Sequence, residues 1–240
     1  MLTGEGLIGK IITTIASKVA SRLLGIPMDK RRKVAQALTK LYFATVRLDE
    51  VTDQFIEIFD RFGKDADDSD ALLIAIKTEG KSIDTASETF AELSDEIYAA
   101  LLILDPVLAN CLNFLKTGKG DFLSFLSNSV RLSTDGGNTR LKVEMPNARI
   151  LSTDFDSIYK LCTQKHEQGE QYYWPEGVFD YFNDFEIVEI IFDDPHAAKE
   201  LTSMISHQQL LLKQARESLR VLLKDNLTLE EVFSASNNIN

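Results

Sequence analysis

One apolar seam, spaced by three and four residues, runs through residues 29–62 and constrains the fold more than any other feature. Such spacing keeps one face of an α-helix apolar over its whole length. Asp29 is a suitable N-cap, and Gly63 ends the pattern. At about 1.5 Å per residue the seam predicts a helix roughly 50 Å long, and such helices are typical of elongated bundles. The seam positions are Val34, Leu38, Leu41, Thr45, Leu48, Thr52, Phe55, Phe59 and Phe62.

Two further long helices are expected from the same kind of spacing. Thr85 and Glu88 form a capping box, which predicts the start of a helix over about 85–104. Pro195 suits the first turn of a last long helix over about 195–224. Shorter helical patterns are found at 71–77, 107–115, 122–126 and 154–165.

One segment alternates between apolar and polar residues in the way a β-strand does. The alternation stands on both sides of an Asp-Gly-Gly-Asn turn at 135–138, which predicts a β-hairpin. An isolated hairpin is marginally stable, so we expect it to pack on helices. Its apolar positions are Val130, Leu132, Leu141, Val143 and Met145.

These patterns predict a mainly α-helical protein: an elongated helical bundle with long helices, an amphipathic N-terminal helix and one small β-hairpin. The N-terminal helix would occupy 1–26, the first part of the bundle 27–127 and the hairpin insertion 128–150. Residues 151–240 would hold aromatic-rich short helices and the C-terminal long helix. No linker separates the two halves, so we expect one domain rather than two.

Charge divides the chain unevenly. The first 33 residues sum to +5 in a chain of net charge −11, which leaves −16 on the remainder. An apolar face of the N-terminal helix carries Ile8, Ile12, Ile15, Val19 and Leu23. The basic residues around and after it are Lys10, Lys18, Arg22, Lys30, Arg31, Arg32 and Lys33. A basic amphipathic helix suits an anionic membrane surface, an acidic partner or the protein's own acidic body.

The sequence shows no catalytic, cofactor-binding or metal-ligating set of residues. Residues 4–10 match phosphate-loop patterns, but those loops need a preceding strand, and none is predicted here. His166, His196 and His207 lack the second histidine of a zinc-binding pair. The acidic balance argues against nucleic acid as a partner, because phosphate recognition needs a broad basic face.

Aromatic residues concentrate between 155 and 192. They fill a core beneath short helices in one interpretation, and in the other some of them line a groove for a partner. The groove candidates are Tyr172, Tyr173, Trp174 and Tyr181.

The functional expectation is therefore a non-enzymatic helical interaction protein, a subunit or adaptor of a larger assembly that binds a protein partner or itself. One alternative is a membrane-active effector that uses its basic amphipathic N-terminal helix. Another is an enzyme whose site is assembled from distant residues. We expect a cytoplasmic location, because Cys111 and Cys162 fit two buried, reduced thiols, or a peripheral position at a membrane. No apolar run approaches the roughly 20 residues of a spanning helix.

Overall fold

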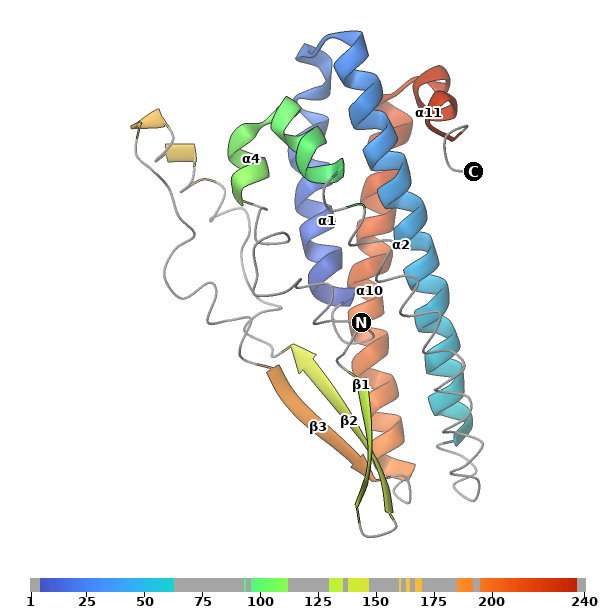
Figure 1. Ribbon diagram of the computed structural model, residues 1–240. Coiled ribbons are helices and arrows are strands. Elements are labelled where there is room, and N and C mark those ends of the chain that lie inside the picture. The colour runs from blue at the N-terminus through green and yellow to red at the C-terminus, as the bar shows by residue number, and fades with distance from the viewer. Residues whose placement is uncertain are drawn as a thin grey trace.

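The computed structural model describes residues 5–62, 93, 96–111, 130–135, 138–146, 160, 163–164, 167–169, 185–191 and 195–236 (Figure 1). Helices dominate this part of the chain, which confirms the prediction of a mainly α-helical protein. The two longest are α2, Met28–Phe62, with 35 residues, and α10, Pro195–Asn226, with 32. Both cover the ranges that their seams predict.

The long helices lie side by side, with α10 between α2 and the N-terminal helix α1, Glu5–Ala20 (Figure 1). A short 3-10 helix, η1, Leu23–Gly25, connects α1 to α2. After α10 the chain turns into α11, Leu229–Ser236, which packs against α2. The first and last parts of the chain therefore meet along α2 and α10.

The seam of α2 forms much of the core. Each of its positions from Val34 to Phe59 is buried, and the side chain of Phe62 lies outside the described residues. Two threonines interrupt the seam, and their hydroxyls donate to backbone carbonyls one turn earlier. Thr45 donates to the Leu41 carbonyl at 2.7 Å, and Thr52 donates to the Leu48 carbonyl at 2.8 Å. The threonines therefore bury no unsatisfied hydroxyl and keep a methyl group for packing.

A break at Asp105 separates a helical stretch, 96–104, from α4, Pro106–Cys111. The Asp105 carboxylate accepts a hydrogen bond from the backbone N of Val107 at 3.0 Å, as an N-cap does. Pro106 fits the first turn because that position needs no backbone donor. Leu101 and Leu104 from this region join the core that the long helices form.

Three antiparallel strands form one sheet in the order β1-β2-β3. β1, Val130–Asp135, pairs with β2, Asn138–Pro146, so that Asp135 lies opposite Asn138. β2 then pairs with β3, Phe185–Ile191, which leads toward the start of α10 and contacts it (Figure 1).

The strand β3 lies in the region for which the sequence analysis expected short helices. Four of its seven residues are β-branched, which favours an extended backbone over a helix: Ile187, Val188, Ile190 and Ile191. A third strand also pairs the free edge of β2, and this makes a sheet more stable than an isolated hairpin. Pairing between segments so far apart in the sequence, such as Arg140 with Ile191, has no signal in local periodicity.

Candidate interaction surface

The apolar face of α1 is covered by α10. Ile12, Ile15 and Val19 are each at most 2% exposed, and Leu23 just beyond the helix is fully buried. The side chain of Ile8 lies outside the described residues. In this conformation the predicted membrane-facing stripe belongs to the protein's own core.

Gly9 allows α1 to approach α10 closely. A Cβ atom built at Gly9 would lie 2.6 Å from the backbone oxygen of Leu211, so any other residue would push the helices apart. The hydroxyl of Thr13 donates to the Gly9 carbonyl at 2.9 Å and keeps this polar group within the helix. The glycine that completes the phosphate-loop pattern thus has a packing role in the structure.

The predicted basic residues have different surroundings. Arg22 pairs with the buried carboxylate of Asp105 at 3.0 Å. Lys10 and Lys18 are half-buried and interact within the chain. The side chains of Lys30 and Lys33 are exposed. The protein's own acidic body therefore takes up part of the positive charge.

Arg31 joins three segments at one end of the long helices. Its Nε donates to Glu231 Oε1 of α11 at 2.5 Å. Its Nη1 donates to the carbonyl of Leu23 in η1 at 3.1 Å, and its Nη2 donates to the carbonyl of Asn226 at the end of α10. We call Arg31, Glu231 and these two carbonyls the Arg31 clasp. It connects the α1–α2 turn to the α10–α11 turn.

Glu231 has a second function, as the capping residue of α11. Its Oε2 accepts hydrogen bonds from the backbone N and the hydroxyl of Thr228, at 2.7 and 2.9 Å. The Glu231 backbone N donates in return to Thr228 Oγ1 at 3.3 Å, which completes a capping box. Burial raises the pKa of Glu231, but the hydrogen bonds from Thr228 and Arg31 outweigh burial and place its pKa below the ordinary value.

Three large apolar side chains are exposed beside the Arg31 clasp. Leu24 is 80% exposed, Met28 is 53% exposed and Leu229 is 75% exposed. Leu24 follows Leu23, Leu229 lies two residues before Glu231, and Met28 lies three residues before Arg31 itself. Figure 1 shows the α1–α2 turn and α11 at the same end of the molecule. We call these three residues the apolar tip. Lys30, Lys33 and Glu230 add exposed charges near it.

A polar cluster crosses the interface between α2 and α10. The buried carboxylate of Asp49 accepts hydrogen bonds from Gln209 at 2.9 Å and from Arg216. Lys213 lies 3.7 Å from Asp49 and 3.6 Å from Asp53. Burial raises the pKa of Asp49, and the charges of Lys213 and Arg216 oppose that effect only in part. The cluster fixes how α2 sits against α10.

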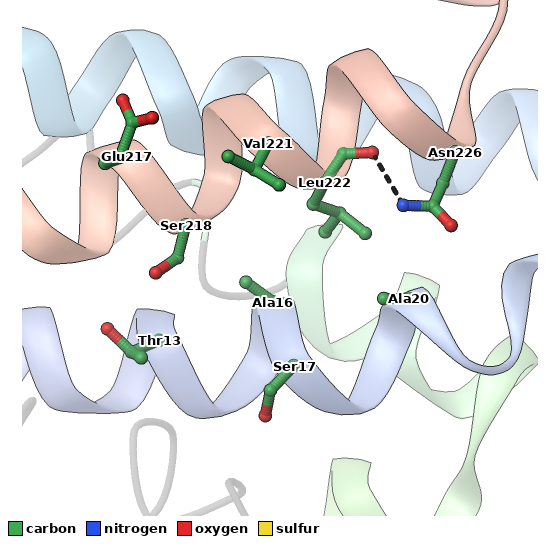
Figure 2. A pocket seen from close by; sticks show the side chains of 9 residues that line it. All are labelled: Thr13, Ala16, Ser17, Ala20, Glu217, Ser218, Val221, Leu222 and Asn226. Carbon is green, nitrogen blue, oxygen red and sulfur yellow. Dashed lines mark hydrogen bonds between the residues drawn. The ribbon is translucent and has the colours of Figure 1, made fainter.

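A shallow groove of about 350 Å³ lies between α1 and α10 (Figure 2). Ala16 and Ser218 enter it from opposite helices, and their short side chains leave the space open. Its remaining lining is Thr13, Ser17, Ala20, Glu217, Val221, Leu222 and Asn226.

The predicted aromatic groove residues Tyr172, Tyr173, Trp174 and Tyr181 all lie outside the described residues. Within the described part of the chain, no group of three or more His, Cys, Asp or Glu side chains is placed to hold a metal ion. None of the helices described is long and apolar enough to cross a membrane.

The apolar tip and the Arg31 clasp were not predicted, although the sequence holds signals for the clasp. Arg31 precedes Val34 by three residues and so occupies a position of the α2 seam. Thr228 and Glu231 have the spacing of a capping box. The exposure of Leu24 and Leu229 has no such signal, because it depends on which segments meet.

Comparison with known proteins gives no relative. No protein-family model matches the chain, and no curated protein or solved structure matches it.

Proposed function

We propose that this chain is a non-enzymatic interaction protein, a subunit or adaptor of a larger assembly, that binds a protein partner through its apolar tip. In this proposal the body is an elongated helical bundle of one domain, and the small β-hairpin region decorates it. The observation that carries the proposal is the exposure of Leu24 and Leu229, which lie one and two residues from the Leu23 and Glu231 groups that Arg31 joins. Large apolar side chains gathered on a surface are typical of protein interfaces.

The surroundings of the apolar tip support a protein partner. Exposed charged residues of both signs stand near it, with Lys30 and Lys33 on α2 and Glu230 on α11. An apolar centre with a polar rim is the usual arrangement of a protein–protein interface. The tip is also well supported, because the Arg31 clasp holds the two segments that carry it. A surface held in place loses less entropy on binding.

Photo-cross-linking tests this proposal. A photoreactive amino acid is introduced at Leu24 in the full chain, and the matched control carries it at Leu210. Leu210 is 51% exposed, less than Leu24, and lies roughly 24 Å along α10 from Asn226. We expect a cross-linked protein adduct from position 24 in extract of the source cells, its loss in Leu229→Lys, and no such adduct from position 210. Equal labelling from both positions, or none from position 24, would overturn the proposal.

The membrane-active alternative requires α1 to leave α10, because Ile12, Ile15 and Val19 are buried. A weaker form uses the apolar tip with Lys30 and Lys33 against an anionic surface. Flotation with phosphatidylserine-containing vesicles separates the two proposals. If the apolar tip binds a protein, the full chain stays in the lipid-free fraction. If the full chain floats with the vesicles and Leu24→Lys does not, the result would favour the membrane-binding alternative.

The enzyme alternative has its strongest candidate in the polar cluster around Asp49, since a buried carboxyl with a raised pKa is a common feature of active sites. Gln209, Lys213 and Arg216 already face this carboxylate across the helix interface. This arrangement favours a structural role for the cluster.

A further inference from the structure

We infer that α11 acts as a latch on the α1–α2 turn, so that undocking of the C-terminal helix loosens the end of the N-terminal helix. The inference concerns the chain alone and does not depend on any partner. It rests on the Arg31 clasp, through which one side chain binds α11, the end of α10 and η1 together.

The first step is the charge balance within the clasp. Arg31 is 16% exposed, and the Glu231 side chain that pairs with it is 1% exposed. A guanidinium in such a position needs its carboxylate, because a buried charge without a partner is strongly unfavourable. When α11 undocks, Glu231 leaves and Arg31 must turn toward water.

The second step follows from the other two bonds of Arg31. When the Arg31 side chain turns toward water, the carbonyls of Leu23 and Asn226 lose their hydrogen-bond donors. Each carbonyl then needs water as a partner. Leu23 is fully buried and belongs to η1, so hydration of its carbonyl opens the α1–α2 turn. Val19, one turn earlier and also fully buried, is the next residue to be exposed.

The third step concerns the extent of the opening. The rest of α1 stays on α10 because Ile12 and Ile15 are deep in the core and Gly9 keeps the helices close. The latch therefore controls the last turn of α1 and η1, and it does not release the whole helix. Coupling between two sites through one such element is typically roughly 5- to 150-fold in an equilibrium constant.

Two backbone hydrogen bonds report on this opening. The Arg22 amide donates to the Val19 carbonyl at 3.0 Å, and the Gly25 amide donates to the Arg22 carbonyl at 3.2 Å. Within α11 the Val232 amide, which donates to the Thr228 carbonyl at 3.1 Å, reports on undocking itself. Hydrogen exchange followed by mass spectrometry or NMR measures all three in the full chain.

The test compares Glu231→Gln with Glu230→Gln as its matched control, since Glu230 makes only an exposed pair with Arg32. We expect Glu231→Gln to speed exchange at Val232, Arg22 and Gly25 by roughly tenfold or more, and Glu230→Gln to change none of them.

Val232→Ala is a second variant that weakens α11 docking without touching the clasp, because Val232 is half-buried against the core. The latch predicts faster exchange at Arg22 and Gly25 here too, even if Glu231→Gln fails to fold. In either variant, faster exchange at the amide of position 232 with unchanged exchange at Arg22 and Gly25 would overturn the inference.

Discussion

At the scale of the residue, neighbours in one basic run have different physical roles. Arg31 is a mostly buried member of a clasp, whereas Arg32 makes an exposed pair with Glu230 at 3.2 Å and Lys33 is exposed. The charge count predicts all of them as one basic patch. Their roles differ because, of these three, only position 31 lies on the apolar seam of α2, so its side chain bonds within the packed ends of α10 and α11 while Arg32 meets α11 at the surface.

Replacement of Arg31 should therefore cost far more stability than replacement of Arg32. We expect Arg31→Met to lower the free energy of unfolding by about 2–4 kcal/mol, because it leaves the Glu231 carboxylate buried without its cation. Arg32→Met should change it by less than about 1 kcal/mol, as is usual for an exposed pair. Urea denaturation followed by circular dichroism measures both values. Similar losses in the two variants would contradict the clasp.

Two of the buried carboxyls, those of Glu231 and Asp49, should show opposite pH dependence. The pKa of Glu231 is lowered in the folded state, so its stabilisation is present above its unfolded pKa and is lost as pH falls through the folded value. The pKa of Asp49 is raised, so its stabilisation is present at low pH and is lost as pH rises through the folded value. These statements refer to differences in unfolding free energy between the wild type and a variant without the carboxyl.

Measurement of unfolding between acidic and neutral pH tests this directly. The stability difference between the wild type and Glu231→Gln should shrink as pH falls below the ordinary glutamate range. The wild type should lose stability relative to Asp49→Asn as pH rises. If both stability differences changed with pH in the same direction, the surroundings assigned to Glu231 or to Asp49 would be wrong.

At the scale of the element, periodicity predicts the long helices α2 and α10 well, but it does not predict pairing between distant segments. Seams with three- and four-residue spacing define α2 and α10, because a helix forms from local contacts, although Asp29, expected as an N-cap, lies within the first turn of α2. β3 requires β2 as its neighbour, and Gly9 requires the backbone of α10. Such dependence on a distant segment leaves no local pattern to read.

The close approach of α1 to α10 gives a prediction for Gly9. We expect Gly9→Ala to destabilise the protein by about 1–3 kcal/mol, since the new methyl group meets the Leu211 backbone and overpacks the interface. The better helix propensity of alanine, about 1 kcal/mol, offsets only part of this. Gly25→Ala is the control, because an added Cβ there meets nothing within 4 Å. Thermal unfolding compares them, and an unchanged Gly9→Ala variant would disprove the close contact.

At the scale of the whole molecule, the chain uses its own acidic body to balance its basic N-terminal part. Arg22 pairs with Asp105, Arg31 with Glu231 and Arg32 with Glu230. The sequence shows the charge division and the apolar stripe of α1, but it does not show which part of the protein covers that stripe. The structure places that stripe inside the core and leaves the apolar tip as the candidate binding surface.

Substitution at the apolar tip should separate binding from folding. We expect the double variant Leu24→Lys with Leu229→Lys to keep its free energy of unfolding within about 0.5 kcal/mol, because both side chains are largely exposed. The same variant should lose the partner that position 24 reaches. Calorimetry and the cross-linking assay measure the two effects. A large loss of stability would mean that these residues belong to the core.

A lock between α1 and α10 tests the central claim most directly. Thr13 and Ser218 line the groove from the two helices (Figure 2). Both are replaced by cysteine in a chain that also carries Cys111→Ser and Cys162→Ser. A short bis-maleimide then joins the two new cysteines. If the protein binds through its apolar tip, the locked chain should give the same adduct from position 24 as the unlocked chain. Loss of that adduct on locking would show that α1 must leave α10 to function and would contradict the account.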